Sequence, residues 1–475
     1  MKPMMILGIG LIVLGAGGMA LVAAAAAPGR EPQVEGTPAP FVPVPVTILL
    51  GSNNEGVLVS CGCAGSPSGG FAKRQTIIDE MRRTRPSVLL VDAGDLFPEH
   101  PNAVKAKYLA TALARAKYDA LAVGVNEIET GLPLVRSMAR DKKLPYICAN
   151  LRDGAGNLIF PPHVIREVGG LRIGLFAVIA EEALGNLSSD GRKGLKVEPP
   201  IEAARREVRD LAGCDVVIAL SHQPFGATQT LAREAPGIRV IVSGHDETIL
   251  RKPLEVGNTM IVAAGPVGRM IGWFTVVHVA DGDPAVVAEL VGLTAQVPDT
   301  PWVTDLYNQY IKEAKGDLPP DWELKTALAA YEAAENCGRC HEAQYRQWRA
   351  TKHAHAFATL QKVGRQGDPE CIVCHTVGYG RGGFSSDEKT PDLKDVTCQT
   401  CHPVTSVHGE KGAPKEEQLD PRTHVTARLC IGCHGLTESP NFDYAAYRPM
   451  IVHKPVAVAG NWPKATSTGK ERGAK

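Results

Sequence analysis

Residues 87–95 read SVLLVDAGD, an apolar run that ends in two carboxylates separated by an alanine and a glycine. An apolar run of this length, with polar residues at its end, is typical of a strand buried in a parallel sheet. Similar runs flank it, VTILL at 46–50 and DALAVG at 119–124, and helical patterns separate them at 71–83 and near 102–117. This alternation of strand and helix predicts an α/β layered fold.

The alternation continues, and one α/β domain is predicted over residues 46–295. Its further strand-like runs are PYICAN at 145–150, LRIGLFAVIA at 171–180, CDVVIALSH at 214–222, IRVIVSGH at 238–245, TMIVAAG at 259–265 and MIGWFTVVHVA at 270–280. A Pro-rich connector around one amphipathic stretch is expected over 296–330. A second domain, mostly helical and rich in loops, is predicted over 331–455, with a disordered tail at 456–475.

The amino terminus has the pattern of an export signal. Lys2 precedes an apolar run over 4–22, and the alanines that follow offer A-x-A cleavage sites. We therefore expect a signal peptide over 1–27 and a Pro-rich linker over 28–45, with the mature chain periplasmic or otherwise exported. The alternative is an uncleaved membrane anchor, because the run approaches the length of a spanning helix.

Charge excludes one class of partner. Lys plus Arg and Asp plus Glu number 51 each, so no bulk charge draws the 475-residue chain to nucleic acid or to an anionic surface. We expect no nucleic-acid polymer among its partners. Membrane contact is expected only through an uncleaved amino-terminal segment.

Four C-x-x-C-H motifs follow residue 331. In such a motif two thiols form thioethers to a haem and the adjacent histidine binds its iron. The attachment cysteines are Cys337, Cys340, Cys371, Cys374, Cys398, Cys401, Cys430 and Cys433, and the proximal histidines are His341, His375, His402 and His434. Zinc knuckles are the alternative, but a histidine directly after a cysteine bends poorly onto the same ion. Four c-type haems are therefore predicted.

Five further histidines can supply the four distal iron ligands. They are His353, His355, His408, His424 and His453. This surplus suggests mostly bis-His iron, in which two imidazoles block exogenous ligands and make the haem an electron carrier. For any one of the five, the alternative is a solvated loop residue.

The haem-motif segment resembles a known family over residues 335–455. The stretches CGRCHEAQYRQWRATKHAHAFATL, CIVCHTVGY and CQTCHPVTSVHGE are similar to the tetrahaem cytochromes whose best-known member accepts electrons from hydroxylamine oxidoreductase. The resemblance implies electron transfer, a distal-ligand role for His353 and haems packed as a short wire. Redox partner proteins are therefore expected, with the donor and the acceptor left open.

Polar side chains follow nearly every predicted strand of the first domain. They are Asn53, Glu55, Asp95, Asn126, His222, His245 and Glu247. Because ligands gather at the carboxyl ends of parallel strands, we expect one shared metal or substrate site there. For each residue alone, the alternative is a cap or a loop position.

Over 46–295 the chain resembles the calcineurin-like metallophosphoesterases, especially periplasmic 5′-nucleotidases and UDP-sugar hydrolases. The blocks GGFAKRQTIIDEMRR, AGD, ALSH and SGH carry the likeness. The resemblance implies two metal ions bridged by Asp95, with His222 and His245 as ligands, and a metal-activated water that attacks phosphorus.

The same comparison exposes departures from that family. Asn53 and Glu55 replace its D-x-H motif, Val125 and Asn126 replace the Asn and the catalytic His of G-N-H-E, and Glu247 replaces the last histidine of G-H-x-H. Carboxylates and amides still bind hard cations, so a rebuilt site could hold a divalent metal. The two-metal hydrolytic set is nonetheless incomplete.

A Cys-x-Cys pair lies close to these positions in sequence. Cys61 and Cys63 stand in a Gly-rich loop ahead of a predicted helix, where the helix dipole and basic neighbours lower a thiol pKa. The pair also resembles a loop in nucleotidase-like exported proteins, some of which carry selenocysteine. A redox or metal-binding pair is one interpretation. A structural disulfide is the other, because Cys148 and Cys214 also lie outside the haem motifs.

Three hypotheses of function remain. In the first, an exported redox protein binds a substrate, metal or partner through its first domain and exchanges electrons with four haems. In the second, a nucleotidase-like hydrolase carries an accessory cytochrome module. In the third, the chain only transfers electrons and its first domain is a scaffold.

Overall fold

The computed structural model describes residues 44–60, 68–99, 101–185, 187, 192–277, 285–314, 330–404, 408, 425, 427–434, 439 and 441–453. The expected signal peptide, tail and Cys61–Cys63 loop lie outside these residues. No helix of the described ranges is long and apolar enough to cross a membrane.

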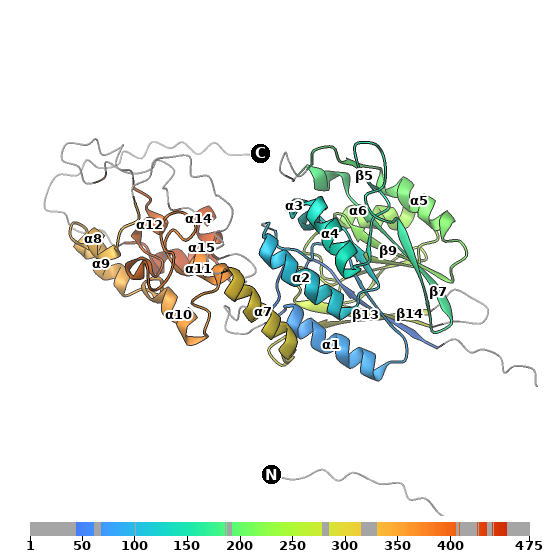
Figure 1. Cartoon of the computed structure of the whole chain (residues 1–475), viewed down its shortest axis with the longest axis horizontal. Coiled ribbons are helices and arrows are strands. Elements are labelled where there is room, and N and C mark those ends of the chain that lie inside the picture. Colours follow the sequence, from blue (N-terminus) through green and yellow to red (C-terminus); the bar gives the residue numbers. More distant parts are fainter. Residues whose placement is uncertain are drawn as a thin grey trace, which may run out of the picture. The chain divides into compact units, whose positions relative to one another are not determined.

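Two six-stranded sheets form the first part of the chain (Figure 1). In the first sheet the order is β14-β13-β1-β2-β3-β4, and β1 to β4 run parallel. These strands are β1 (Val46–Gly51), β2 (Val88–Asp92), β3 (Ala120–Ala122), β4 (Tyr146–Ile147), β13 (Met270–Val277) and β14 (Ala285–Gly292). The antiparallel pair β13 and β14 closes one edge.

The second sheet has the order β11-β12-β10-β9-β7-β6. Its strands are β6 (His163–Val168), β7 (Leu171–Ile179), β9 (Val216–His222), β10 (Val240–Ser243), β11 (Leu254–Val256) and β12 (Thr259–Ala263), and a separate pair joins β5 (Leu151–Arg152) to β8 (Lys196–Val197). The four inner strands run parallel, and antiparallel β11 and β6 form the edges.

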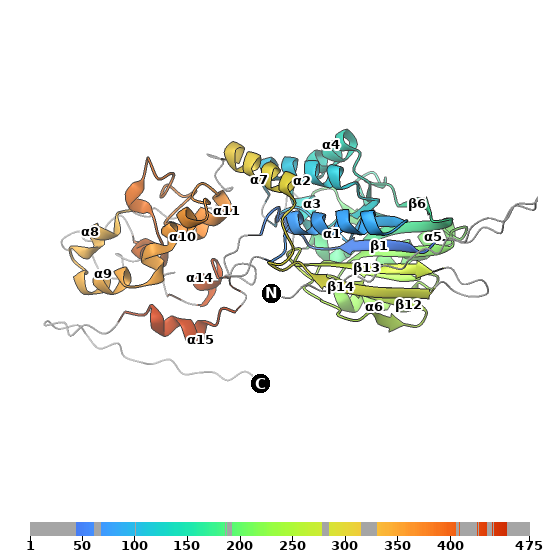
Figure 2. The same ribbon diagram turned by 90° about the horizontal axis from the view of Figure 1, so that it is seen from below.

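Helices cover the outer faces of both sheets, which gives four layers (Figure 2). On the first sheet lie α1 (Phe71–Thr84), α2 (Ala103–Ala116), α3 (Val125–Glu129), α4 (Leu132–Lys142) and α7 (Pro301–Ala314); on the second lie α5 (Pro200–Asp210) and α6 (Phe225–Glu234). The predicted α/β layered fold is confirmed. The amphipathic stretch inside the expected connector is α7, whose Tyr307 and Tyr310 are buried in the core of the first part.

The apolar runs seen in the sequence follow from burial on two faces. Along β1, Ile48 and Leu50 pack between the two sheets, whereas Leu49 packs with the helices outside the first sheet. Side chains alternate between faces along a strand, so a strand covered on both faces loses the alternation of apolar and polar residues. Cys148 and Cys214 are unpaired, and Cys148 is fully buried in the helix-side core.

A buried ion pair fixes helix α1 to strand β2. Arg74 Nη1 donates to Asp92 Oδ2 over 2.8 Å, and neither side chain is more than 1% exposed. The backbone of Gly51 lies directly against this pair. A Cβ there would stand 2.5 Å from Asp92 Oδ2 and 2.6 Å from Arg74 Nη1, so only glycine fits.

The haem-motif segment is built from short helices joined by loops, as predicted. They are α8 (Ala334–Gly338), α9 (Glu342–Arg349), α10 (Ala356–Lys362), α11 (Pro369–His375), α12 (Cys398–Cys401), α14 (Ala427–Ile431) and α15 (Tyr444–Tyr447). Its cluster of buried apolar residues is small and contains Phe357, Leu360, Cys371, Ile372, Tyr379 and Phe384.

We expect Gly51→Ala to lower the free energy of unfolding by at least about 2 kcal/mol, because the added methyl group must displace a buried ion pair. Urea unfolding followed by far-ultraviolet circular dichroism measures the change. Gly226→Ala in α6 is the matched control, since its Cβ meets open space and alanine favours the helix. Equal midpoints for the two variants would contradict the role given to Gly51.

Candidate functional site

The sequence-predicted polar residues follow the carboxyl ends of strands in both sheets. Asp95 follows β2, His222 ends β9 and His245 follows β10. Several of these loop positions have left-handed backbone: φ is +46° at Asn53, +50° at Glu55, +56° at Asp95 and +78° at His245. Such strain in residues other than glycine persists only where the surrounding structure enforces it, and it clusters at functional sites.

Three of these side chains converge. Asp95 Oδ2 lies 3.4 Å from His222 Nε2, and His245 Nδ1 lies 3.3 Å from the same nitrogen. One donor atom from each residue falls within 4.8 Å of the other two, which is close enough for all three to hold one metal ion. Asp95 and His222 are buried and His245 is half-buried.

Hydrogen bonds fix the orientation of His222 and Asp95. His222 Nδ1 donates to Ala93 O over 2.8 Å, so its Nε2 is the nitrogen that faces Asp95 and His245, and this nitrogen also accepts the Val125 N–H over 3.4 Å. Asp95 Oδ1 accepts the Asn126 N–H over 2.9 Å. Burial raises and the nearby His222 lowers the pKa of Asp95, and the net direction is down, so this carboxylate stays ionised.

Glu127 holds the loop that carries Asp95. Its carboxylate accepts three backbone N–H groups, from Leu96 at 2.9 Å, Asp95 at 3.0 Å and Gly124 at 2.8 Å. Burial, and then the charge of Asp95, raise its pKa to about 7. Glu127 follows Asn126 directly in sequence, but nothing in the strand-end pattern indicates that it positions its neighbours rather than binding a ligand.

The side-chain amides of Asn53 and Asn126 are hydrogen-bonded to backbone groups. Asn53 Oδ1 accepts the His245 N–H at 3.0 Å and its Nδ2 donates to Asp246 O at 3.1 Å. Asn126 Nδ2 donates to Phe97 O at 3.0 Å. These amides therefore position the chain around Asp95 and His245, and Asn53 is no free ligand.

The two remaining predicted residues differ in burial. Glu55 is half-buried, and burial followed by the charge of Asp95 raises its pKa to about 7. Glu247 is exposed at the surface. Its neighbour Asp246, absent from the predicted set, caps α6 by accepting the Phe225 N–H at 2.7 Å. The sequence gives one sign that another residue must cap this helix, because α6 begins after Pro224, whose side chain cannot accept a hydrogen bond.

In the haem-motif segment, three motif histidines each face a histidine from outside the motifs. The ring centres are 6.2 Å apart for His341 and His408, 6.0 Å for His402 and His453, and 6.1 Å for His434 and His353. Burial, the largest cause, lowers the pKa of His353, His402, His434 and His453, which favours their neutral, ligand-competent form.

The other predicted histidines behave differently. His375 Nδ1 lies 2.8 Å from Ala356 O, and His355 is exposed with its Nε2 3.2 Å from Arg349 O. Among the described residues no ring contact pairs another imidazole with His375. His424 lies outside the described ranges.

The described motifs also lie near one another. The neighbouring Cys337 thiol raises the pKa of Cys398, and the Cys430 and Cys433 thiols contribute to a raised pKa of Cys401, after the larger effect of burial. His375 adds to burial in lowering the pKa of His434. The motif at 398–402 therefore lies close to those at 337–341 and 430–434, and the motif at 430–434 lies close to the one at 371–375.

Comparison with known families identifies this segment. Residues 336–403 match the family model described as cytochrome c554 and c-prime. The match includes the first three C-x-x-C-H motifs. The predicted cytochrome c554-like region is confirmed, and haem is the cofactor that this likeness suggests.

Curated relatives identify the first part. It is 30% identical to human 5′-nucleotidase over 228 residues, which cover 44% of this chain and 39% of that protein. The snake venom 5′-nucleotidase of Crotalus adamanteus is 31% identical over 199 residues, covering 40% of this chain and 34% of that protein. The chain thus spans less than half the length of these relatives.

Solved structures agree on the fold. A 5′-nucleotidase precursor from Thermus thermophilus superimposes with a TM-score of 0.52 at 20% identity, over 68% of each chain. The chain joins a 5′-nucleotidase-like fold to a cytochrome c554-like region. The calcineurin-like phosphoesterase YfkN from Bacillus subtilis gives a TM-score of 0.51 at 19% identity, over 57% of this chain and 97% of that one. At such identities these structures establish the fold alone.

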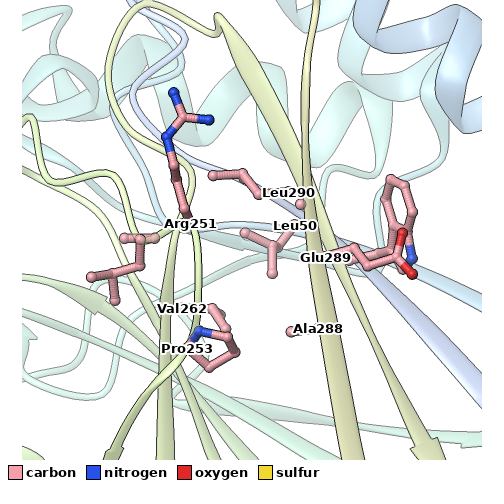
Figure 3. A pocket seen from close by; sticks show the side chains of 11 residues that line it. Leu50, Arg251, Pro253, Val262, Ala288, Glu289 and Leu290 are labelled. Carbon is pink, nitrogen blue, oxygen red and sulfur yellow. The ribbon is translucent and has the colours of Figure 1, made fainter.

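A small cavity between β12, β13 and β14 is separate from the Asp95 cluster (Figure 3). Aliphatic side chains such as Leu50, Val262 and Leu290 line it, and its charged residues Arg251 and Glu289 point in different directions. None of the sequence-predicted site residues lines this cavity.

We expect Glu127→Gln to lower the free energy of unfolding by about 1–3 kcal/mol, because an amide has one acceptor oxygen for three backbone donors and leaves buried N–H groups unpaired. Denaturant unfolding measures the loss. The control is Glu247→Gln, an exposed carboxylate near the same cluster, for which we expect no change. A Glu127→Gln variant as stable as this control would show that the three bonds contribute little.

Proposed function

We propose that this chain is an exported electron-transfer protein that holds four covalent haems. The cytochrome c554-like match and the four C-x-x-C-H motifs support the cofactor. The observation that carries the proposal is the set of three imidazole pairs, since each pair combines one motif histidine with one histidine from elsewhere.

The separation of each pair fits two ligands on one iron. An imidazole nitrogen binds a first-row metal at about 2 Å, so two imidazoles on opposite sides of one ion have ring centres about 6 Å apart. The observed separations run from 6.0 to 6.2 Å. We therefore assign His408, His453 and His353 as the distal partners of His341, His402 and His434, respectively.

The fourth motif histidine, His375, faces no second imidazole among the described residues, but its ring is also oriented to bind iron. With Nδ1 of His375 directed to Ala356 O, its Nε2 remains for the metal. In His434 the Nδ1 atom lies 3.0 Å from Ser439 Oγ, which leaves Nε2 free there too. We assign no distal ligand to the haem of His375, and His424 stays a candidate for that position.

The closeness of the haem-attachment motifs to one another supports a path for electrons. Haem bound by two imidazoles supplies reversible one-electron transfer. The protein side chains hold these sites next to one another, and the motif at 398–402 adjoins both the 430–434 and the 337–341 motifs. A row of adjacent carriers suits a protein that connects a donor to an acceptor. We propose that the 5′-nucleotidase-like part binds the substrate, metal or partner served by this row.

A pyridine haemochrome assay of the exported protein should return four haems per chain. We further expect His408→Ala, His453→Ala and His353→Ala each to convert one low-spin haem to a high-spin haem that binds carbon monoxide, because each removes one axial imidazole. Electron paramagnetic resonance and the carbon monoxide difference spectrum measure this conversion.

The matched control for these variants is His355→Ala. His355 lies in the same short stretch as His353 but is exposed and directed to a backbone carbonyl. It should leave all low-spin signals unchanged. Two haems or fewer per chain would refute the proposal, and conversion by His355→Ala but not by His353→Ala would refute the ligand assignment.

A second candidate function is metal-dependent phosphoester hydrolysis, favoured by the 5′-nucleotidase relatives and by the Asp95, His222 and His245 cluster. We expect no more than trace hydrolysis of 5′-AMP with Mn²⁺ or Zn²⁺ added, because Val125 and Asn126 replace the family's amide ligand and catalytic histidine. Phosphate release measures turnover. Rapid turnover that Asp95→Asn abolishes would establish the hydrolase instead.

A further inference from the structure

We propose that the 5′-nucleotidase-like part binds one divalent transition-metal ion, rather than two, through Asp95, His222 and His245. The family's two-ion arrangement does not fit the residues present, whereas a single site does. This proposal is independent of the haem assignment, since it concerns different residues and a separately counted metal.

Two of the three donor separations match a tetrahedral ion, and the third is no more than 4.8 Å. Ligand atoms at about 2.0–2.1 Å from a tetrahedral zinc ion lie about 3.3–3.4 Å apart. His222 Nε2 is 3.4 Å from Asp95 Oδ2 and 3.3 Å from His245 Nδ1. Three protein ligands leave the fourth position open, which is the arrangement of catalytic rather than structural zinc sites.

The types of donor atom select the metal. Because the Nδ1–H of His222 is used by Ala93 O, its Nε2 faces the Asp95 carboxylate and an imidazole nitrogen of His245, and it also accepts the Val125 N–H over 3.4 Å. Two imidazole nitrogens with one carboxylate oxygen favour transition metals such as Zn²⁺, Fe²⁺ or Mn²⁺ over Mg²⁺ and Ca²⁺.

The surrounding backbone holds the three ligands in place. Asp95 and His245 both keep a left-handed backbone, which their loops must enforce. The amide of Asn53 clamps the His245–Asp246 segment, and Asn126 N–H holds the Asp95 carboxylate. Residues at former ligand positions thus orient the ligands that remain.

The second ion lacks a comparable donor set. Asn53 directs its oxygen to the His245 N–H, and Glu247 is exposed. Among the predicted site residues this leaves the half-buried Glu55 as the carboxylate that could join Asp95 on that side. Among the described residues, only Asp95, His222 and His245 form a group of three donors within reach of a common ion.

Zinc stoichiometry of the full haem-loaded chain tests this proposal. The protein is stripped with a chelator, equilibrated with Zn²⁺ and analysed by mass spectrometry for zinc, and haem is counted by pyridine haemochrome on the same sample. Full haem occupancy matters, because empty C-x-x-C motifs would bind zinc themselves. We expect one zinc per chain, and parallel loading with Mn²⁺ should give the resonance spectrum of an isolated ion rather than a coupled pair.

Variants assign the ligands. Asp95→Asn, His222→Ala and His245→Ala should each weaken zinc binding by at least about tenfold, whereas Glu247→Gln should keep one zinc at unchanged affinity. If a ligand variant fails to fold, Val125→Asn tests the same metal site by adding a fourth ligand instead of removing one. The backbone N of Val125 lies 3.4 Å from His222 Nε2, so the new amide oxygen should tighten binding without raising the stoichiometry.

Three outcomes would overturn the proposal: no zinc at full haem occupancy, two zinc ions per chain, or one zinc that survives all three ligand variants. A low haem count with one zinc lost in Asp95→Asn would instead refute the haem assignment and leave the metal site standing. Triple replacement Asn53→Asp, Glu55→His and Glu247→His, which rebuilds the family's lost motifs, should raise the count toward two.

Discussion

The hydrogen bond from His222 Nδ1 to Ala93 O joins the two sheets at the edge where the site lies. His222 ends β9 of the second sheet, and Ala93 follows β2 of the first. Two glycines allow this approach, because a Cβ at Gly94 would stand 2.8 Å from His222 Nδ1 and one at Gly244 would stand 2.7 Å from Ala93 O. This close contact brings Asp95, from the first sheet, within reach of His222 and His245, from the second.

Strain in the backbone is concentrated beside that contact. Of the eight described residues other than glycine with positive φ, four are Asn53, Glu55, Asp95 and His245. Lys117 and Lys143, by contrast, end helices, where a left-handed residue is ordinary. Asn53 shows how the strain is held, since its amide bonds both His245 and Asp246. The side chain of Asn53 thus supports the segment that carries His245.

Sequence pattern could predict most of the strands and the three side chains that converge, but not the role of each polar residue. Asp95, His222 and His245 stand at strand ends, and that placement alone brings them together. Asn53 has the same placement, yet its side chain serves the backbone, which depends on a loop contact across 192 positions that no local pattern encodes. Strand β14 was also missed, although its stretch AVVAELVG is largely apolar, because a short apolar run does not by itself distinguish a strand from a helix and its pairing with β13 decides the matter.

In the haem-motif segment, the partner that a histidine faces separates ligand candidates from surface residues, and the local sequence pattern does not. His353 and His355 are two residues apart, but His353 faces His434 whereas His355 is exposed and directed to Arg349 O. The apolar core of this region is small, so side-chain burial alone offsets little of the entropy of ordering its loops. Covalent haems, each tied to two cysteines and one histidine, would add both cross-links and apolar surface. If the proposed haems are bound, folding and electron transfer depend on the same residues, and loss of one motif should cost structure as well as one carrier.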